Sequence, residues 1–204
     1  MGWKWMARLA VLGRPQMAGM TQADSRLLLL QYQQQPDPAL LQQLFLRYAD
    51  ALYHFLLKQS DAEMAQDLSQ QAWIQLMLHA GSYQGQSSVK TWLFSFGRNL
   101  LIDEWRRQRP QAEPELLEQL PDPAAKPLQQ LLQAEQLADL GQAIQRLPAV
   151  QREALLLQLE DFSLAQISEI TGAGAETVKT RLRYARQQLQ HWLTPAEEES
   201  NDDR

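Results

Sequence analysis

The chain has 204 residues, 45% hydrophobic residues and a formal net charge of −5, ordinary values for a protein that buries one or two small cores. It contains no cysteine, which excludes disulfide frameworks, iron–sulfur clusters and thiolate zinc sites, and it has no apolar run of about eighteen residues that would cross a membrane. We therefore expect a cytoplasmic protein with no membrane insertion.

Residues 1–20 are expected to form an extension ahead of the folded part. Their short apolar run is interrupted by Arg8, so it predicts neither a transmembrane helix nor a signal peptide. Because Met17 and Met20 follow Met1, the sequence leaves the translation start open.

The next segment, residues 21–109, has the periodicity of α-helices. Apolar residues recur at three- and four-residue steps from Leu41 to Phe55 and again from Leu93 to Leu100. No useful length alternates with a period of two. We therefore predict an all-α fold, and Pro36 and Pro38 mark a turn between two of its helices.

A proline-rich segment follows and divides the chain. Five of the ten prolines lie between Pro110 and Pro127, where the missing N–H and the fixed φ angle interrupt regular structure. Residues 110–140 also hold six acids against one cation. We expect two small helical domains, at 21–109 and 132–193, joined by an acidic linker at 110–131 and followed by an acidic tail at 194–204.

The first cluster of cations lies at residues 91–109, TWLFSFGRNLLIDEWRRQR. We expect Leu93, Phe96 and Leu100 to face inward. Trp92 and Trp105 either stack on nucleic-acid bases or belong to the core, and the spacing does not decide between the two. The outward or flanking positions are Arg98, Asn99, Asp103, Arg106 and Arg107.

A polar loop, GSYQGQSSV at 81–89, precedes that helix. Gly85, Ser87 and Ser88 either form a small hydrogen-bonding pocket or belong to an ordinary connection.

Residues 162–189 have the pattern of a helix-turn-helix. Ser163 can cap a helix whose buried positions are Ile167 and Ile170, and Gly172 suits the left-handed conformation that ends such a helix. After Gly174, a second helix repeats apolar residues at four, three and four positions: Val178, Leu182, Ala185 and Leu189.

The opposite face of this second helix holds polar and basic side chains, with two arginines on its flanks. A helix of this kind fits the major groove of B-DNA, where its first half meets base edges and its arginines meet phosphates. A solvated basic face is the alternative. The residues that we predict to contact DNA are Glu176, Thr177, Lys179, Thr180, Arg181, Arg183 and Arg186.

Four stretches in this order resemble bacterial RNA polymerase sigma factors of the sigma-70 family, in particular the extracytoplasmic-function group. They are FLRYADALYHFLLK, AQDLSQQAWIQL, TWLFSFGRNLLIDEWRRQR, and LPAVQREALLLQLEDFSLAQISEITGAGAETVKTRLRYAR. The resemblance covers residues 24–193. It implies sigma domain two at 21–109 and sigma domain four at 132–193.

The resemblance also implies partners. Core RNA polymerase would be bound through the coiled coil of its largest subunit and through its flap, and promoter DNA would be bound both as duplex and as single strand. An anti-sigma factor is a further expected partner. The residues that match the family's polymerase-binding surface are Asp67, Leu68, Gln70, Gln71 and Trp73.

In the family, a promoter element near minus ten is opened and one near minus thirty-five is read as duplex. The helix-turn-helix matches the part that reads the duplex. For the opened strand, the matching residues are Tyr83, Ser87, Ser88, Arg98, Asn99, Asp103, Arg106 and Arg107.

Two other functions are compatible with parts of the sequence, and a third is not favoured by it. A stand-alone helix-turn-helix regulator would bind DNA without polymerase, and an interaction protein would bind polymerase without using promoters. An enzyme is disfavoured, since the three histidines are scattered and no phosphate-binding loop or nucleophile motif is present. We expect no catalytic residues, no metal site and no cofactor.

Overall fold

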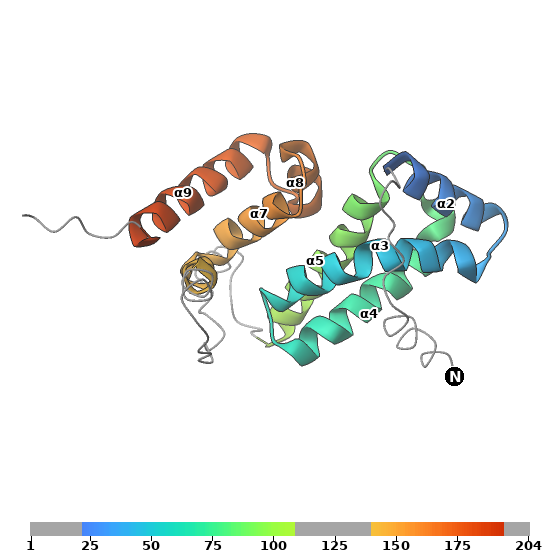
Figure 1. Ribbon diagram of the computed structural model, residues 1–204, viewed down its shortest axis with the longest axis horizontal. Coiled ribbons are helices and arrows are strands. Elements are labelled where there is room, and N and C mark those ends of the chain that lie inside the picture. Colours follow the sequence, from blue (N-terminus) through green and yellow to red (C-terminus); the bar gives the residue numbers. More distant parts are fainter. Residues whose placement is uncertain (1–21, 109–139, 194–204) are drawn as a thin grey trace, which may run out of the picture.

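The computed structural model describes residues 22–108 and 140–193, and all regular structure in these two ranges is helical (Figure 1). The predicted all-α fold is therefore confirmed. The predicted extension at 1–20, linker at 110–131 and tail at 194–204 lie outside the described residues.

The first group of helices packs around one apolar core. Leu44, Leu52, Leu56 and Leu93 are fully buried there, and the rings of Phe55 and Phe94 lie 5.3 Å apart. Full burial of one such side chain stabilises a fold by about 1.5–3 kcal/mol. The helices are α2 (Gln22–Gln34), α3 (Pro38–Leu57), α4 (Ala62–His79), the short 3₁₀ helix η1 (Ala80–Ser82) and α5 (Val89–Gln108).

Aspartates begin two of these helices. The side chain of Asp37 accepts a hydrogen bond from the Ala39 N–H at 2.8 Å, and that of Asp61 accepts one from the Met64 N–H at 2.8 Å. Each carboxylate satisfies a backbone donor that has no partner within the helix, and its charge suits the positive end of the helix dipole.

Helix α5 packs against Leu52 of α3 at Gly97, which is buried. A Cβ atom at this position would lie 2.8 Å from Cδ1 of Leu52, closer than real Cβ contacts come. A larger residue at this position would therefore require the Leu52 side chain to shift.

The buried face of α5 differs from the prediction. Leu93 is fully buried as expected, but Phe96 and Leu100 are only half-buried, whereas Phe94 and Leu101 are fully buried. The reason is that α5 contacts α8 as well as α3 and α4, so it buries more than one face. Periodicity within a single helix identifies one face only.

The second group of helices contains the helix-turn-helix. Its elements are a helix at residues 140–146, α7 (Ala149–Leu159), α8 (Leu164–Thr171) and α9 (Ala175–Leu193).

The local signals of the helix-turn-helix are confirmed. Ser163 and Gln166 form a reciprocal capping box at the start of α8, and Gly172 ends that helix in the left-handed conformation with φ of 68°. Ile167, Ile170 and Val178 are buried beneath the turn, with Leu182 and Ala185. Leu189, the last residue of the predicted stripe, is half-buried.

The two groups of helices lie against each other through α5 and α8 (Figure 1). At their contact the rings of Phe94 and Phe162 meet edge to face, with centroids 4.9 Å apart. Within the described ranges, no helix is both long and apolar enough to cross a bilayer.

Gly172→Ala should lower the free energy of unfolding by about 1 kcal/mol, because any residue with a Cβ is strained at a left-handed φ. Nothing lies within 4 Å of the added carbon, so the effect is purely conformational. Urea denaturation followed by circular dichroism measures it.

Two matched variants check this explanation. Gly172→Asn should lose less than Gly172→Ala, since asparagine tolerates the left-handed region. Gly81→Ala, at a position with no atom within 4 Å and without a positive φ, should not destabilise. An equal loss for Gly172→Asn and Gly172→Ala would contradict the conformational explanation.

Candidate nucleic-acid interface

Helix α9 presents its predicted DNA-contacting residues away from its buried stripe. Glu176, Thr177, Lys179, Thr180, Arg183 and Arg186 are exposed, and Arg181 is half-buried. The buried residues Val178, Leu182 and Ala185 lie on the other side and fix the rotation of the helix about its axis. The predicted DNA-facing side is therefore available at the surface.

The cations of α9 have weak partners. Lys179 Nζ lies 2.7 Å from Glu176 Oε1, with side chains that are 53% and 86% exposed. Arg186 donates to Gln158 Oε1 at 2.6 Å, and Arg183 lies over the ring of Tyr184. Exposed ion pairs of this type contribute little stability, so a phosphate can replace the carboxylate at small cost.

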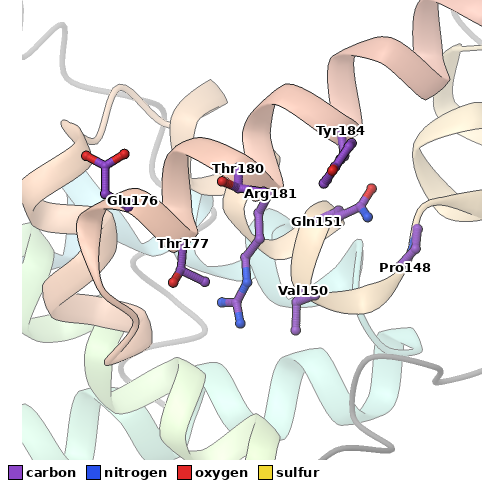
Figure 2. Close-up of a pocket in the computed structure, with 8 residues that line it drawn as sticks. All are labelled: Pro148, Val150, Gln151, Glu176, Thr177, Thr180, Arg181 and Tyr184. Atoms are coloured by element: carbon purple, nitrogen blue, oxygen red, sulfur yellow. The ribbon is translucent and has the colours of Figure 1, made fainter.

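An open cavity of about 600 Å³ lies between α9 and the start of α7 (Figure 2). The guanidinium of Arg181 extends from α9 toward the first turn of α7, beside Thr177 and Val150 (Figure 2). A guanidinium placed beside the N-terminus of a helix favours an anionic ligand such as a backbone phosphate. The lining residues are Pro148, Val150, Gln151, Glu176, Thr177, Thr180, Arg181 and Tyr184.

The second predicted surface lies on α5, and most of its residues are exposed. Asn99, Asp103, Arg106 and Arg107 all lie at the surface. Asp103 and Arg106 form a loose pair at 3.7 Å, and Arg107 lies 2.9 Å from Glu104. These arginines near the end of α5 remain accessible to a nucleic-acid strand.

Arg98 is placed differently from these four residues. Its side chain is only 20% exposed, and its Nε donates to Glu153 Oε1 of α7 at 3.0 Å. Glu153 itself is 5% exposed in its side chain. The predicted strand-binding arginine is therefore covered by the helix-turn-helix group.

The loop before α5 is held by its own polar groups. The hydroxyl of Tyr83 donates to the backbone oxygen of Ser87 at 2.7 Å, and Tyr83 is only 5% exposed. Burial raises the pKa of this hydroxyl, and Arg26 nearby offsets part of the rise. Tyr83 therefore positions the loop rather than offering its ring to a base.

Ser88 is engaged at the start of α5. Its Oγ accepts a hydrogen bond from the Thr91 N–H at 3.0 Å and lies 2.8 Å from Thr91 Oγ1. This hydroxyl caps the helix. For Ser88, the structure therefore supports an ordinary connection rather than a small hydrogen-bonding pocket. Ser87 is half-buried beside it.

Helix α2 supports the loop from the other side. Gln33 Nε2 donates to the backbone oxygens of Ala80 and Tyr83, at 2.6 and 2.7 Å. The Arg26 side chain lies so close to Gly85 that a Cβ there would be 2.7 Å from its Cζ. Gly85 also has φ of 71°, and this left-handed backbone conformation favours glycine.

The structure also places the two tryptophans of α5. Both are half-buried and pack against the core. Trp92 lies in a run of rings, with its centroid 5.1 Å from that of Tyr83 and 4.9 Å from that of Phe96. Their main role is packing, and only part of each ring reaches the surface.

The predicted polymerase-binding residues on α4 separate into two groups. Asp67 and Gln71 are exposed and Gln70 is half-buried, whereas Leu68 and Trp73 are 2% and 3% exposed. Side chains buried to that degree hold the helix in place and cannot themselves form an intermolecular contact. Asp67, Gln70 and Gln71 remain as surface groups, with Ile74 half-buried on the same face.

Sequence reasoning missed the residues that join the two groups of helices: Lys90, Thr91, Glu153, Glu160, Phe162 and Gln166. Their partners are 55 to 75 positions apart along the chain. The sequence identifies Lys90 as a cation at the start of a basic helix, but it does not identify Glu160 as its partner. Across the part of the chain that is described, no group of His, Cys, Asp and Glu could hold a metal ion.

Two family models match the chain, Sigma-70 region 2 over residues 44–111 and Sigma-70, region 4 over residues 137–189. The ECF RNA polymerase sigma factor RpoE of Cereibacter sphaeroides is 33% identical over 165 residues, which cover 78% of this chain and 88% of that protein. The ECF RNA polymerase sigma factor SigM of Bacillus subtilis is 30% identical over 154 residues, which cover 73% and 92%.

A solved structure is also similar. It is the sigma factor RpoE in complex with the anti-sigma factor NepR from Bartonella quintana, with a TM-score of 0.60 and 28% identity. The match covers 76% of this chain and 97% of that one.

Tyr83→Phe should loosen the loop at 84–88, because it removes the part-buried hydrogen bond from the Tyr83 hydroxyl to the Ser87 carbonyl. Amide hydrogen exchange should become faster in this loop, and the free energy of unfolding should fall by about 1 kcal/mol. The control is Tyr184→Phe, since Tyr184 is 44% exposed and its change should stay within about 0.5 kcal/mol. Unchanged exchange at 84–88 in Tyr83→Phe would show that other contacts hold the loop.

Proposed function

The chain belongs to the extracytoplasmic-function group of the sigma-70 family, and from this premise we propose that it binds core RNA polymerase and directs transcription initiation at specific promoters. The observation that carries the proposal is the presence of two separate basic helices, α9 and the exposed end of α5, in one small chain. A protein that reads promoter DNA at two places needs two such surfaces.

The proposal assigns the upstream element to α9, which reads it as duplex. Glu176, Thr177 and Thr180 lie in the first half of this helix, where a recognition helix meets base edges. Lys179, Arg183 and Arg186 are placed to bind phosphates, and Arg181 adds a further cation beside the cavity. The ion pair between Lys179 and Glu176 would open when DNA binds.

The downstream element is assigned to α5 and the loop before it. Asn99, Asp103, Arg106 and Arg107 would line the path of the separated strand, and Arg98 would join them once it is uncovered. Tyr83, Ser87 and Ser88 would shape the loop that receives an extruded base. Extrusion costs a few kcal/mol of unstacking, which strand contacts and polymerase contacts together must offset.

Polymerase would contact the exposed face of α4 through Asp67, Gln70 and Gln71, and Leu68 and Trp73 would hold that face from within the core. The largest-subunit coiled coil is the proposed partner there, and the flap is proposed for the domain at 132–193. The linker at 110–131 would connect the two domains.

The charge of the chain supports dependence on polymerase. Residues 88–109 hold five cations against two acids, and residues 141–191 hold six against five, so neither DNA-facing part is strongly basic. Protein–DNA affinity rises with the number of phosphates neutralised. Free chain should bind promoters poorly, and polymerase would supply the missing affinity.

We also propose that an anti-sigma factor regulates this protein and that the protein is cytoplasmic. RpoE of Bartonella quintana was solved in complex with the anti-sigma factor NepR, which supports an anti-sigma partner for this chain as well. We place the protein in the cytoplasm, where polymerase and DNA are, and assign it no catalytic activity of its own.

Run-off transcription with purified core polymerase tests the proposal. On a library of promoter fragments, transcripts with defined start sites should appear only when this protein is added. Lys179→Ala combined with Arg183→Ala should reduce these transcripts at least about tenfold, since each lost contact is worth 1 kcal/mol or more. A gel shift of promoter DNA by the chain alone, with no effect on transcription, would favour a stand-alone regulator.

Asp67→Arg should weaken association with core polymerase about tenfold, because it reverses a charge at the centre of the proposed contact. The side chain is exposed, so the circular dichroism spectrum and melting temperature should not change. Asp50→Arg, the same charge reversal at an exposed position of α3, is the control and should bind normally. Equal affinity for Asp67→Arg and the unchanged chain would remove this face of α4 from the interface.

A further inference from the structure

The face of α5 that meets the helix-turn-helix group has the composition of a nucleic-acid site. Lys90, Phe94 and Arg98 follow one another at four-residue steps, so they lie along one side of the helix. The two cations are eight residues apart, which is about 12 Å along a helix axis. Cations flanking an aromatic ring suit a strand with phosphates and bases.

Lys90 is held entirely by the helix-turn-helix group and its neighbouring rings. Its Nζ donates to the backbone oxygen of Glu160 and lies 3.5 Å from the Glu160 Oε2. The same nitrogen lies over the rings of Phe162 and Phe94, at 4.6 and 5.5 Å from their centroids. Burial lowers the pKa of Lys90, and the Glu160 carboxylate offsets part of that effect.

Arg98 is held in the same way by a carboxylate from the other group of helices. Glu153 Oε1 accepts from its Nε at 3.0 Å, and the two side chains are 20% and 5% exposed. Thr91, on the intervening turn, accepts a hydrogen bond from Gln166 of α8 at 3.1 Å. Each cation of this face therefore has one carboxylate from the helix-turn-helix group as its partner.

A carboxylate and a phosphate are interchangeable partners for these cations, because both offer anionic oxygens to the same donors. Ion pairs buried at an interface contribute little net stability, since desolvation offsets most of their attraction. The other contacts between the two groups are the packing of α5 on α8, one pair of rings and single hydrogen bonds, and both groups contribute to one cluster of buried apolar residues. Exchange of the carboxylates for phosphates is therefore feasible.

We propose that Lys90 and Arg98 form one strand-binding site, and that Glu160 and Glu153 occupy it in the described arrangement in place of two phosphates. The helix-turn-helix group and single-stranded DNA then compete for one face of α5. This inference rests on the proposed function, and it adds Lys90 to the strand-binding residues. It requires the two groups of helices to separate before the strand can bind.

Binding of the full-length chain to a short fluorescent single-stranded DNA tests the competition. Glu153→Gln combined with Glu160→Gln should raise affinity about tenfold, because Lys90 and Arg98 would keep their charges in the packed arrangement without carboxylate partners. An unchanged or lower affinity in this double variant would overturn the proposal.

The role of Lys90 is measured in the double-glutamine background, where its bond to the Glu160 carboxylate no longer contributes. Lys90→Ala should make the slope of log affinity against log salt shallower by about 0.7, the value of one phosphate contact on a single strand. Arg146→Ala, which removes an exposed cation outside the proposed site, should leave the slope unchanged. A purely structural role of Lys90 would not alter the slope, and that result would overturn its assignment.

Separation of the two groups is measured directly by spin labels. The chain has no native cysteine, so Glu63→Cys on α4 and Gln187→Cys on α9 provide a unique pair at exposed positions. Single-stranded DNA should shift the distance distribution to longer values, as should the double-glutamine change. Bound DNA with an unchanged distribution would show that the two groups do not compete.

Arg106→Ala combined with Arg107→Ala distinguishes this inference from the proposed function. If this variant loses strand binding while the glutamine variants gain none, only the competition is wrong. If this variant binds normally, the assignment of α5 to the separated strand is itself wrong.

Discussion

Helix α5 packs on two sides at once, and the other features of the molecule depend on this. Towards α3 and α4 it completes the first core through Leu93 and Phe94. Towards the helix-turn-helix group it presents Lys90, Thr91 and Phe94. One helix therefore carries both the stability of the first group of helices and the contact with the second. A change at Phe94 would disturb both together, because its ring touches Phe55 on one side and Phe162 on the other.

The helix-turn-helix could be predicted from the sequence because its determinants are local. The cap at Ser163, the left-handed Gly172 and the apolar steps after it act within one or two turns of chain. The partner of Arg98 could not be predicted, because Glu153 is far along the chain and nothing near either residue signals the other. Burial was a second property that the sequence did not reveal. Leu68 and Trp73 match a functional motif, but they lie in the core. Only the three-dimensional structure distinguishes such supporting residues from the exposed ones.

Three cations of the two DNA-facing surfaces share one property. Lys179, Arg106 and Arg107 each pair with an acidic residue three positions earlier on their own helix. Such pairs hold the cationic side chains at the surface. Breaking one of them costs well under 1 kcal/mol. Arg98 and Lys90 instead pair with the other group of helices. A cation paired within its own helix can exchange its partner for a phosphate independently of the others. Lys90 and Arg98 can do so only when the two groups of helices separate.

The packing at Gly97 affects the orientation of α5 about its own axis. A Cβ at Gly97 would lie 2.8 Å from Leu52 Cδ1, so the close packing of α5 on this side chain resists rotation of the helix about its long axis. Arg98 and Asn99 follow Gly97 directly in the chain. This contact therefore influences the side of α5 from which both side chains extend. The missing side chain of Gly97 thus contributes, together with the Glu153 carboxylate, to the placement of the Arg98 guanidinium.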